Sequence, residues 1–334
     1  MTLIYAERVE GWIMMIGDSG TTAPSGLANN PFTDAVIKVR LWHHNTILGF
    51  AGNVHMFNRF LEGPPPADFD GVIRDAVSFQ QAHGDQAPDF LIAKPDGSAL
   101  VRVVDGRAGD RPKAYIGSHK AHQRFQQIRT DTLPPEAVAP MLGLAMHSPF
   151  VPPGTPRQIL VNCSAFHQTL IDNIDDVRGF PVALISGPGH LSYVDFVEMS
   201  TGNDLSGPEF ADGQYAIQAK DAWSGASFSS VTAIGAYGLA FYSQGAAIGV
   251  YANIETPVHN PVDPEQQSTG FMERDISADD WFQLLADLHQ IPIRARCPSA
   301  TGHFGTDDRT FQPATGGAVS GPLAKGYRML YDEP

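Results

Sequence analysis

Short apolar segments separated by turn residues mark the start of the chain as strand-like. The segments 3–8 and 12–16 predict two strands joined by a tight turn at the sequence VEG. After a loop rich in Gly, Ser, Thr, Pro and Asn at 19–33, the segments 36–41 and 46–50 predict a second pair of strands. The first fifty residues are therefore expected to be mostly sheet.

The pattern then alternates between blocks of helix and blocks of strand. Helical spacing of apolar residues predicts helices at 53–62, 68–83, 119–128, 135–146 and 158–172. Strands are predicted within 89–106, around a PDG turn, and at 180–186 and 191–199. Because helices and strands come in segregated blocks, the pattern favours a layered α+β fold over a doubly wound α/β fold.

Beyond residue 200 the composition shifts toward Gly and Ser. Strands are predicted at 215–220 and 230–253, with a hairpin turn at YSQG, followed by a proline-rich linker at 257–264 and a helix at 278–289. The last forty residues carry too many Gly, Pro and Thr for an assignment. We therefore divide the chain into a core at 2–200 and a C-terminal extension at 201–334.

Composition narrows the classes of function. The 334 residues are 43% hydrophobic, enough for a large core, and the net charge of −14 disfavours nucleic acid as a partner. No segment has the apolar run of a membrane span, so we expect no membrane association. Cys163 and Cys297 lack the spacing of a metal site, and we interpret both as buried, reduced thiols that fit the cytoplasm.

The start of the chain carries the strongest candidate chemistry. Met1 precedes a small residue, so we expect its removal by a methionine aminopeptidase, which leaves Thr2 as the first residue. An N-terminal threonine combines a hydroxyl nucleophile with an α-amine whose ordinary pKa lies near 8, so that part of it is neutral at physiological pH. One residue can then act as nucleophile and general base.

The spacing of three further residues supports this interpretation. Asp18, in the motif IGDS, lies sixteen residues after Thr2, and Lys38, in a KV dipeptide, lies fourteen residues before Gly52 of an AG dipeptide. This pattern resembles the proteasome β-subunits and their bacterial relatives among the N-terminal nucleophile (Ntn) hydrolases. The resemblance covers roughly residues 2–195 and is best over the first 52.

The resemblance implies additional site residues. Thr22 falls four residues after Asp18, as the family's loop threonine does, and Ser118 in AYIGS falls where a serine helps to hold the N-terminal amine. The family's late aspartate has two candidates. Asp175 fits better by position, with Arg178 in place of the usual serine, whereas Asp221 in KDAWSG, followed by Ser224 and Gly225, fits better by motif. We place Asp175 in the site and keep Asp221 as the alternative.

By resemblance, each of these residues has a chemical role. Thr2 Oγ attacks a carbonyl, Lys38 lowers the pKa of its hydroxyl, and Asp18 orients Lys38. The Gly52 N–H stabilises the oxyanion. Phe50 occupies a position that lines the first specificity pocket in the family, and its size implies a preference for small side chains before the cleaved bond.

The resemblance implies a four-layer αββα sandwich, the Ntn-hydrolase fold, that hydrolyses amide bonds, most simply in peptides, without metal or organic cofactor. Relatives assemble, so it also implies a homo-oligomer; whether an ATPase partner exists is left open. Two alternatives stay open: a non-catalytic self-assembling protein of the same fold, and an amidase or acylase for small molecules.

Overall fold

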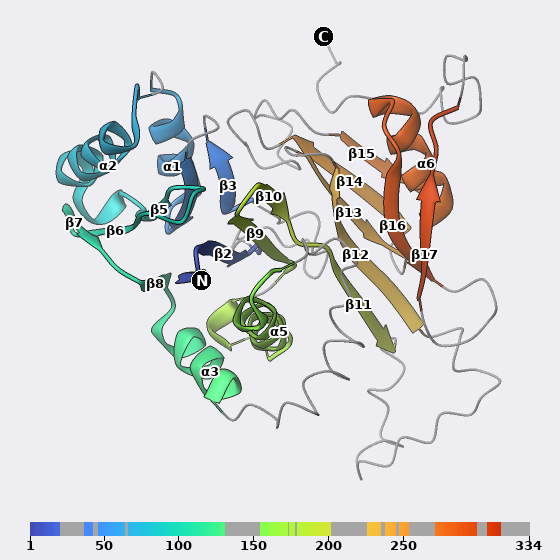
Figure 1. Ribbon diagram of the computed structural model, residues 1–334, viewed down its shortest axis with the longest axis horizontal. Helices are drawn as coiled ribbons and strands as arrows, with labels where there is room; N and C mark the ends of the chain where they lie inside the picture. Colours follow the sequence, from blue (N-terminus) through green and yellow to red (C-terminus); the bar gives the residue numbers. More distant parts are fainter. Residues whose placement is uncertain are drawn as a thin grey trace.

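The computed structural model describes residues 1–20, 37–42, 46–63, 66–130, 154–172, 174–177, 179–201, 226–234, 238–244, 247–253, 271–298 and 306–314. The predicted helix at 135–146, the predicted strand at 215–220 and the predicted linker at 257–264 lie outside these ranges. The described elements form three five-stranded antiparallel sheets, one two-stranded sheet and the helices around them (Figure 1).

The first sheet contains the start of the chain. In spatial order its strands are β10 (His190–Tyr193), β9 (Pro181–Gly187), β2 (Trp12–Asp18), β1 (Leu3–Val9) and β8 (Lys113–Gly117). The β1–β2 hairpin closes with Val9 paired to Trp12, and the two turn residues, Glu10 and Gly11, both have positive φ. This is the conformation of the tight two-residue turns that match strand twist. β1 is thus held between β2 and β8.

The second sheet is a simple meander of strands in chain order. Its strands are β3 (Val39–Trp42), β4 (Thr46–Ala51), β5 (Asp89–Ala93), β6 (Leu100–Val104) and β7 (Arg107–Asp110). Residues of β1 and β2 contact residues of β4, so the two sheets face each other. Alternate residues of β4 therefore point either toward the first sheet or away from it.

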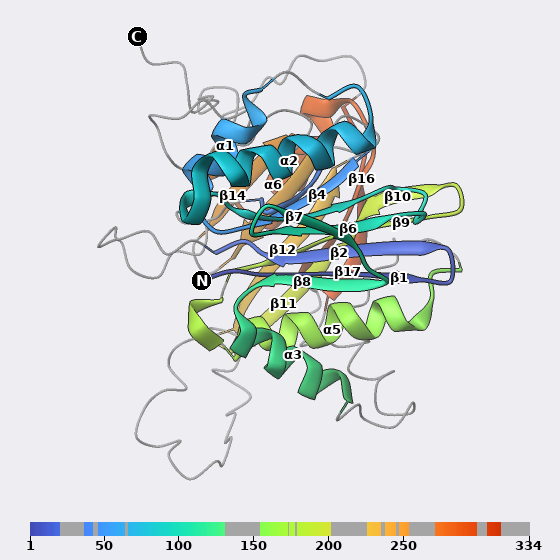
Figure 2. The ribbon, with the colours of Figure 1, turned by 90° about the vertical axis from the view of Figure 1, so that its left-hand side faces the viewer.

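Helices cover the outer faces of both sheets (Figure 2). The second sheet carries α1 (Val54–Leu61), α2 (Phe69–His83) and the short η1 (Gly84–Gln86). The first sheet carries α3 (His119–Thr130), α5 (Arg157–Ile171) and the short η2 (Ile174–Asp176). Two helical layers thus enclose two sheets in a mixed α+β arrangement.

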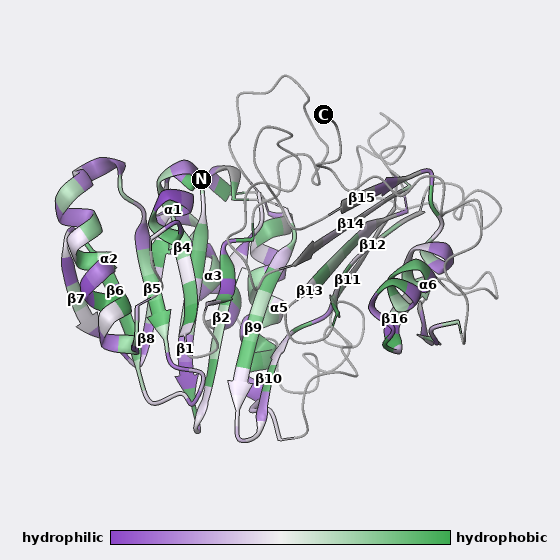
Figure 3. Ribbon diagram, turned by 90° about the horizontal axis from the view of Figure 1, so that it is seen from above, coloured by the Kyte–Doolittle hydropathy of each residue, from purple (hydrophilic) through white to green (hydrophobic). Residues whose placement is uncertain are grey.

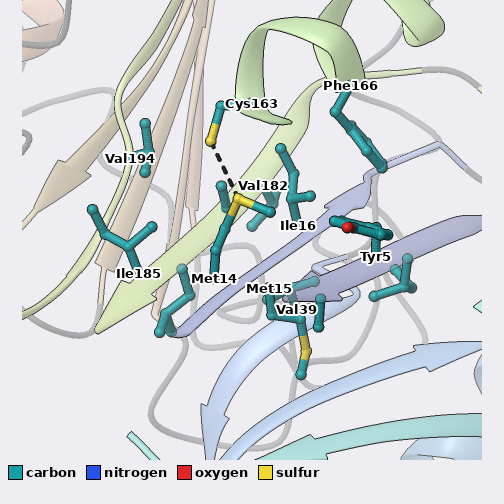
Figure 4. Packing of buried hydrophobic residues seen from close by; sticks show 14 of the residues in the cluster. Tyr5, Met14, Met15, Ile16, Val39, Cys163, Phe166, Val182, Ile185 and Val194 are labelled. Atoms are coloured by element: carbon teal, nitrogen blue, oxygen red, sulfur yellow. Dashed lines mark hydrogen bonds between the residues drawn. The ribbon is translucent and has the colours of Figure 1, made fainter. Parts of the chain in front are cut away.

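Buried apolar side chains fill both faces of the first sheet. β2 is buried along its whole length, because one face meets the second sheet and the other meets α5. On the helical side, the Cys163 thiol donates to Met14 Sδ across 3.7 Å, in the cluster that also holds Val182 and Ile16 (Figure 4). Hydrophobic colouring along β9 and on one side only of α6 follows the same division between core and surface (Figure 3).

A polar network fastens the helices α3 and α5 to β1. Glu7 Oε2 accepts hydrogen bonds from Tyr5 (2.8 Å), Arg129 (3.2 Å) and Asn162 (2.6 Å). Arg129 also lies over the Tyr5 ring, 5.4 Å from its centroid. These charge-assisted bonds satisfy a partly buried carboxylate and fix the position of the helical layer.

The third sheet and its surroundings are built from the C-terminal part of the chain. The strands are β11 (Phe196–Thr201), β12 (Ala226–Ile234), β13 (Gly238–Ser243), β14 (Ile248–Asn253) and β15 (Phe271–Arg274). One face packs on α6 (Ala278–His289) and the β16–β17 hairpin (Ile293–Pro298 and Thr306–Phe311). The other face joins the main core, where the rings of Phe180 and Phe241 lie 5.8 Å apart.

Most of the predicted elements that fall on described residues are confirmed, with one exception. The predicted strand at 191–199 is wrong as one strand: β10 ends at Tyr193 and β11 begins at Phe196, in a different sheet. Asp195 marks the crossing between them, because its carboxylate accepts the N–H of Ala233 across 2.7 Å. Strands β7, β8, β15, β16 and β17 were not predicted, since they are short or lie in Gly- and Pro-rich sequence. The division of the chain at residue 200 stays a prediction.

Both cysteines are free and buried, as predicted. Burial raises the pKa of each thiol to about 12, so neither is a reactive thiolate at neutral pH. Among the described helices, none is long and apolar enough to span a bilayer. Within the same residues, no three His, Cys, Asp or Glu side chains gather in a way that could hold a metal ion.

The contact between Phe180 and Phe241 predicts that the third sheet contributes to the stability of the core. Phe241 is 2% exposed, so Phe241→Ala should lower the free energy of unfolding by about 3–5 kcal/mol in urea titrations. Leu288→Ala is the control, because Leu288 is 41% exposed and its loss should cost about 0.5 kcal/mol. Equal, small losses in both variants would contradict the packing described.

Candidate active site

Thr2 lies at the start of β1, where three elements meet. The Thr2 carbonyl accepts the N–H of Ser118 across 2.7 Å, which extends the pairing of β1 with β8 by one residue. Gly117 makes this approach possible: its φ is +91°, and a Cβ there would overlap the Thr2 carbonyl oxygen. A side chain at Gly117 is excluded twice, by backbone conformation and by space.

Asp18 is brought beside Thr2 by the register of the first hairpin. It is the last residue of β2 and fully buried, and its Oδ1 accepts the N–H of Leu3 across 2.8 Å. Since Ile4 pairs with Gly17, the end of β2 necessarily lies next to the start of β1. The sixteen-residue spacing between Thr2 and Asp18 is thus the length of one hairpin.

Lys38 connects these residues to the second sheet. Its ammonium donates to Thr2 Oγ1 (2.8 Å), to Asp18 Oδ2 (2.6 Å) and to the carbonyl oxygen of Gly20. An ammonium has three N–H bonds, and each has an acceptor here. Lys38 is only 2% exposed, so this complete set of partners is what permits its charge to be buried.

Burial shifts the pKa values of both members of the ion pair. It lowers the pKa of Lys38 and raises the pKa of Asp18, and in each case the charge and hydrogen bond of the partner oppose the shift. A lysine with a lowered pKa exchanges a proton more readily near neutral pH. Lys38 is therefore suited to assist a proton transfer at the Thr2 hydroxyl.

A second polar pair lies on the opposite side of Thr2. Ser118 Oγ donates to Asp175 Oδ2 across 2.9 Å and accepts the N–H of Ala121 across 3.1 Å. Lys120 Nζ lies 3.3 Å from Asp175 Oδ1. The bond from Ser118, followed by the contact with Lys120, lowers the pKa of Asp175, so this side chain is a carboxylate at neutral pH.

Gly52 follows β4 and precedes α1. Its φ of +124° is one that residues with side chains rarely adopt, and a Cβ there would lie 3.3 Å from Pro88 Cα. The preceding residue, Ala51, is 3.4 Å from the Cβ position at Gly117, which places this turn close to Thr2. Asn53 caps α1 by accepting the N–H groups of His55 and Met56.

The remaining predicted residues are placed differently. Phe50 points away from Thr2 into the cluster beneath α1, where its ring stacks on Phe57 with centroids 3.6 Å apart, and it is fully buried. A substrate could reach it only if neighbouring side chains moved; its role stays a prediction. Thr22 and the alternative aspartate, Asp221, lie outside the described residues.

Three residues of the site were not predicted from the sequence. They are Gly20, whose carbonyl accepts from Lys38, Gly117, whose missing side chain admits Thr2, and Lys120, which pairs with Asp175. Gly117 could have been suspected, because a glycine directly before Ser118 marks a close approach. A backbone carbonyl such as that of Gly20 has no signature in sequence.

Two solved structures are similar to this chain over 56% of its length. HslV from Trypanosoma brucei is 12% identical, with a TM-score of 0.37 over 99% of that chain. The Anbu (Gly-1) mutant from Hyphomicrobium sp. strain MC1 is 15% identical, with a TM-score of 0.38 over 82% of that chain. Both are proteasome β-like Ntn hydrolases.

No protein-family model and no curated protein matches the sequence.

The close approach at Gly117 predicts a strong effect of a single methyl group. Gly117→Ala should lower the free energy of unfolding by at least about 2 kcal/mol, from backbone strain and from displacement of Thr2. Gly109→Ala on β7 is the matched control, because it has no left-handed φ and its Cβ would meet only the Arg111 side chain at 3.7 Å. Urea titrations compare the two variants, and an equal effect would contradict the geometry at Gly117.

Proposed function

We propose that this protein is an N-terminal threonine hydrolase that cleaves amide bonds, with a proteasome-like peptidase as the specific form. The observation that supports it is the bonding of Lys38, whose ammonium contacts both Thr2 Oγ1 (2.8 Å) and Asp18 Oδ2 (2.6 Å). The order of helices, sheet, sheet and helices supports the four-layer αββα sandwich of the Ntn hydrolases as the fold.

The reaction requires that everything before Thr2 be removed. While Met1 is attached, the Thr2 nitrogen belongs to a peptide bond and cannot act as a base. Met1 is 57% exposed, so an aminopeptidase could reach it. Its removal would leave an amine and a hydroxyl on the same residue, flanked by Lys38 and by the pair of Ser118 and Asp175.

Acyl transfer then follows in balanced steps. Thr2 Oγ forms a bond to the substrate carbonyl carbon, its proton passes to the Thr2 amine, and the carbonyl oxygen becomes an oxyanion beside the Gly52 N–H. Collapse of this intermediate breaks the C–N bond, and the leaving amine takes the proton. Water then hydrolyses the ester on Thr2 by the same route and restores the hydroxyl.

Covalent labelling tests this proposal directly. A β-lactone should open on Thr2 Oγ and increase the intact mass by one reagent molecule, with the label located on Thr2 by peptide sequencing. Thr2→Val keeps the size of the side chain and should abolish labelling and lower hydrolysis at least about 1000-fold, whereas Thr2→Ser should retain both. If Thr2→Val hydrolyses substrates as fast as the wild type, the proposal is wrong.

The same protein preparation can be used to distinguish a peptidase from a small-molecule amidase. Fluorogenic peptides and small N-acyl compounds are compared as substrates, and faster cleavage of peptides is the result that the peptidase proposal expects. Faster turnover of small N-acyl compounds would instead identify an amidase of the same mechanism. We also propose that the protein forms a homo-oligomer. Size-exclusion chromatography coupled to light scattering measures the molar mass that tests this.

Phe50 is proposed to limit the side chain before the cleaved bond. Phe50→Ala should raise the rate ratio of leucine to alanine peptides by at least about tenfold, because it opens a space beneath α1 close to Gly52. Phe90→Ala is the matched control: Phe90 pairs with Phe50 on the neighbouring strand, is equally buried and belongs to the same cluster. If the leucine-to-alanine ratio changed equally in Phe50→Ala and Phe90→Ala, Phe50 would not be the residue that limits this side chain.

A further inference from the structure

Lys120 occupies a position that the physics of a helix disfavours. It is the second residue of α3, and no acidic residue lies in the first turn of that helix. The N-terminus of a helix carries a partial positive charge, so a lysine there is unfavourable. The Lys120 side chain is 74% exposed, and its ammonium nevertheless lies 3.3 Å from Asp175 Oδ1.

The charged groups around the start of β1 form two pairs. Asp18 with Lys38 lies on one side and Asp175 with Lys120 lies on the other. Lys38 contacts Thr2 directly through Oγ1, whereas Asp175 is linked to it through Ser118. Each of these two pairs is neutral as a whole.

The link from Asp175 to Thr2 is short and runs through Ser118. Ser118 donates its hydroxyl to Asp175 and its backbone N–H to the Thr2 carbonyl. The amine of Met1 also lowers the pKa of both Asp18 and Asp175, as a smaller contribution than those of burial and hydrogen bonding. Asp175 is therefore within electrostatic reach of the Met1 amine, and the Thr2 nitrogen is one residue further along the chain, on the side of Ser118.

We propose that Lys120 is a positioning residue that offsets the negative charge of Asp175. It thereby leaves the Thr2 amine in its neutral form, which can accept a proton, at neutral pH. Asp175 without a partner would stabilise the protonated amine, which cannot accept the proton of the Thr2 hydroxyl. Lys120 lets Asp175 hold Ser118 without this consequence. The inference rests on the proposed role of the amine as general base.

The test measures the pKa of the Thr2 amine without depending on turnover. The full chain is prepared with Thr2 as its first residue by cleavage of a leader, and the pH dependence of trace acylation of the amine is followed by mass spectrometry. Lys120→Gln keeps a hydrogen-bond donor for Asp175 and removes only the charge. It should raise the amine pKa by roughly half a unit, and high salt should reduce the difference.

Three variants separate charge from structure. Lys120→Arg keeps the charge and should keep the wild-type pKa, and the neutral double variant Lys120→Gln with Asp175→Asn should return close to it. Lys113→Gln removes the same charge at the far end of β8, where Lys113 is exposed, and should leave the amine unchanged. An unchanged amine pKa in Lys120→Gln would overturn the inference.

Hydrolysis gives a second readout. At one pH unit below the wild-type amine pKa, Lys120→Gln should be about threefold slower in kcat/KM, with an equal rate on the alkaline plateau. A lower plateau without a shifted limb would indicate a structural role and overturn the inference. If the wild type neither hydrolyses substrates nor reacts with the β-lactone, the proposed function fails, while the amine titration still reports on Lys120.

Discussion

The site depends on one buried ammonium with three acceptors. Lys38 reaches Thr2 Oγ1, Asp18 Oδ2 and the Gly20 carbonyl, and these come from the start of β1, the end of β2 and the residues after it. A charge that is 2% exposed is tolerated only when each of its N–H bonds is paired. Lys38 can be buried only because the two sheets pack face to face and because the register of the first hairpin brings Thr2 and Asp18 together.

Glycines determine how closely the backbone can surround Thr2. Gly117 admits the Thr2 carbonyl against β8, and Gly52 turns the chain from β4 into α1 at the same end of the sheets. On the far side, Ser118 ties Thr2 to Asp175 and Lys120. The backbone around Thr2 is thus fixed by two glycines, and an ion pair lies on each side of it.

Much of the fold could be predicted because its signals are local. The two-residue turn of the first hairpin, the helices α1, α2, α3, α5 and α6, and the meander around the PDG turn follow from periodicity and turn residues. The crossing at Asp195 could not be predicted, since 191–199 has no Gly or Pro to mark a break, and the bond from Ala233 that holds Asp195 comes from a distant strand. Short strands such as β16 exist because the third sheet and α6 bury them.

By itself the sequence determined the spacing of Thr2, Asp18, Lys38 and Gly52 and, through the hairpin, the proximity of the first two. Only the tertiary structure decided that Lys38 points at Thr2, that Ser118 meets Asp175, and that Phe50 lies buried against Phe57. The physical reason is range: turns and periodicity act within a few residues, whereas burial and ion pairing join groups that only the packing of whole sheets and helices brings together.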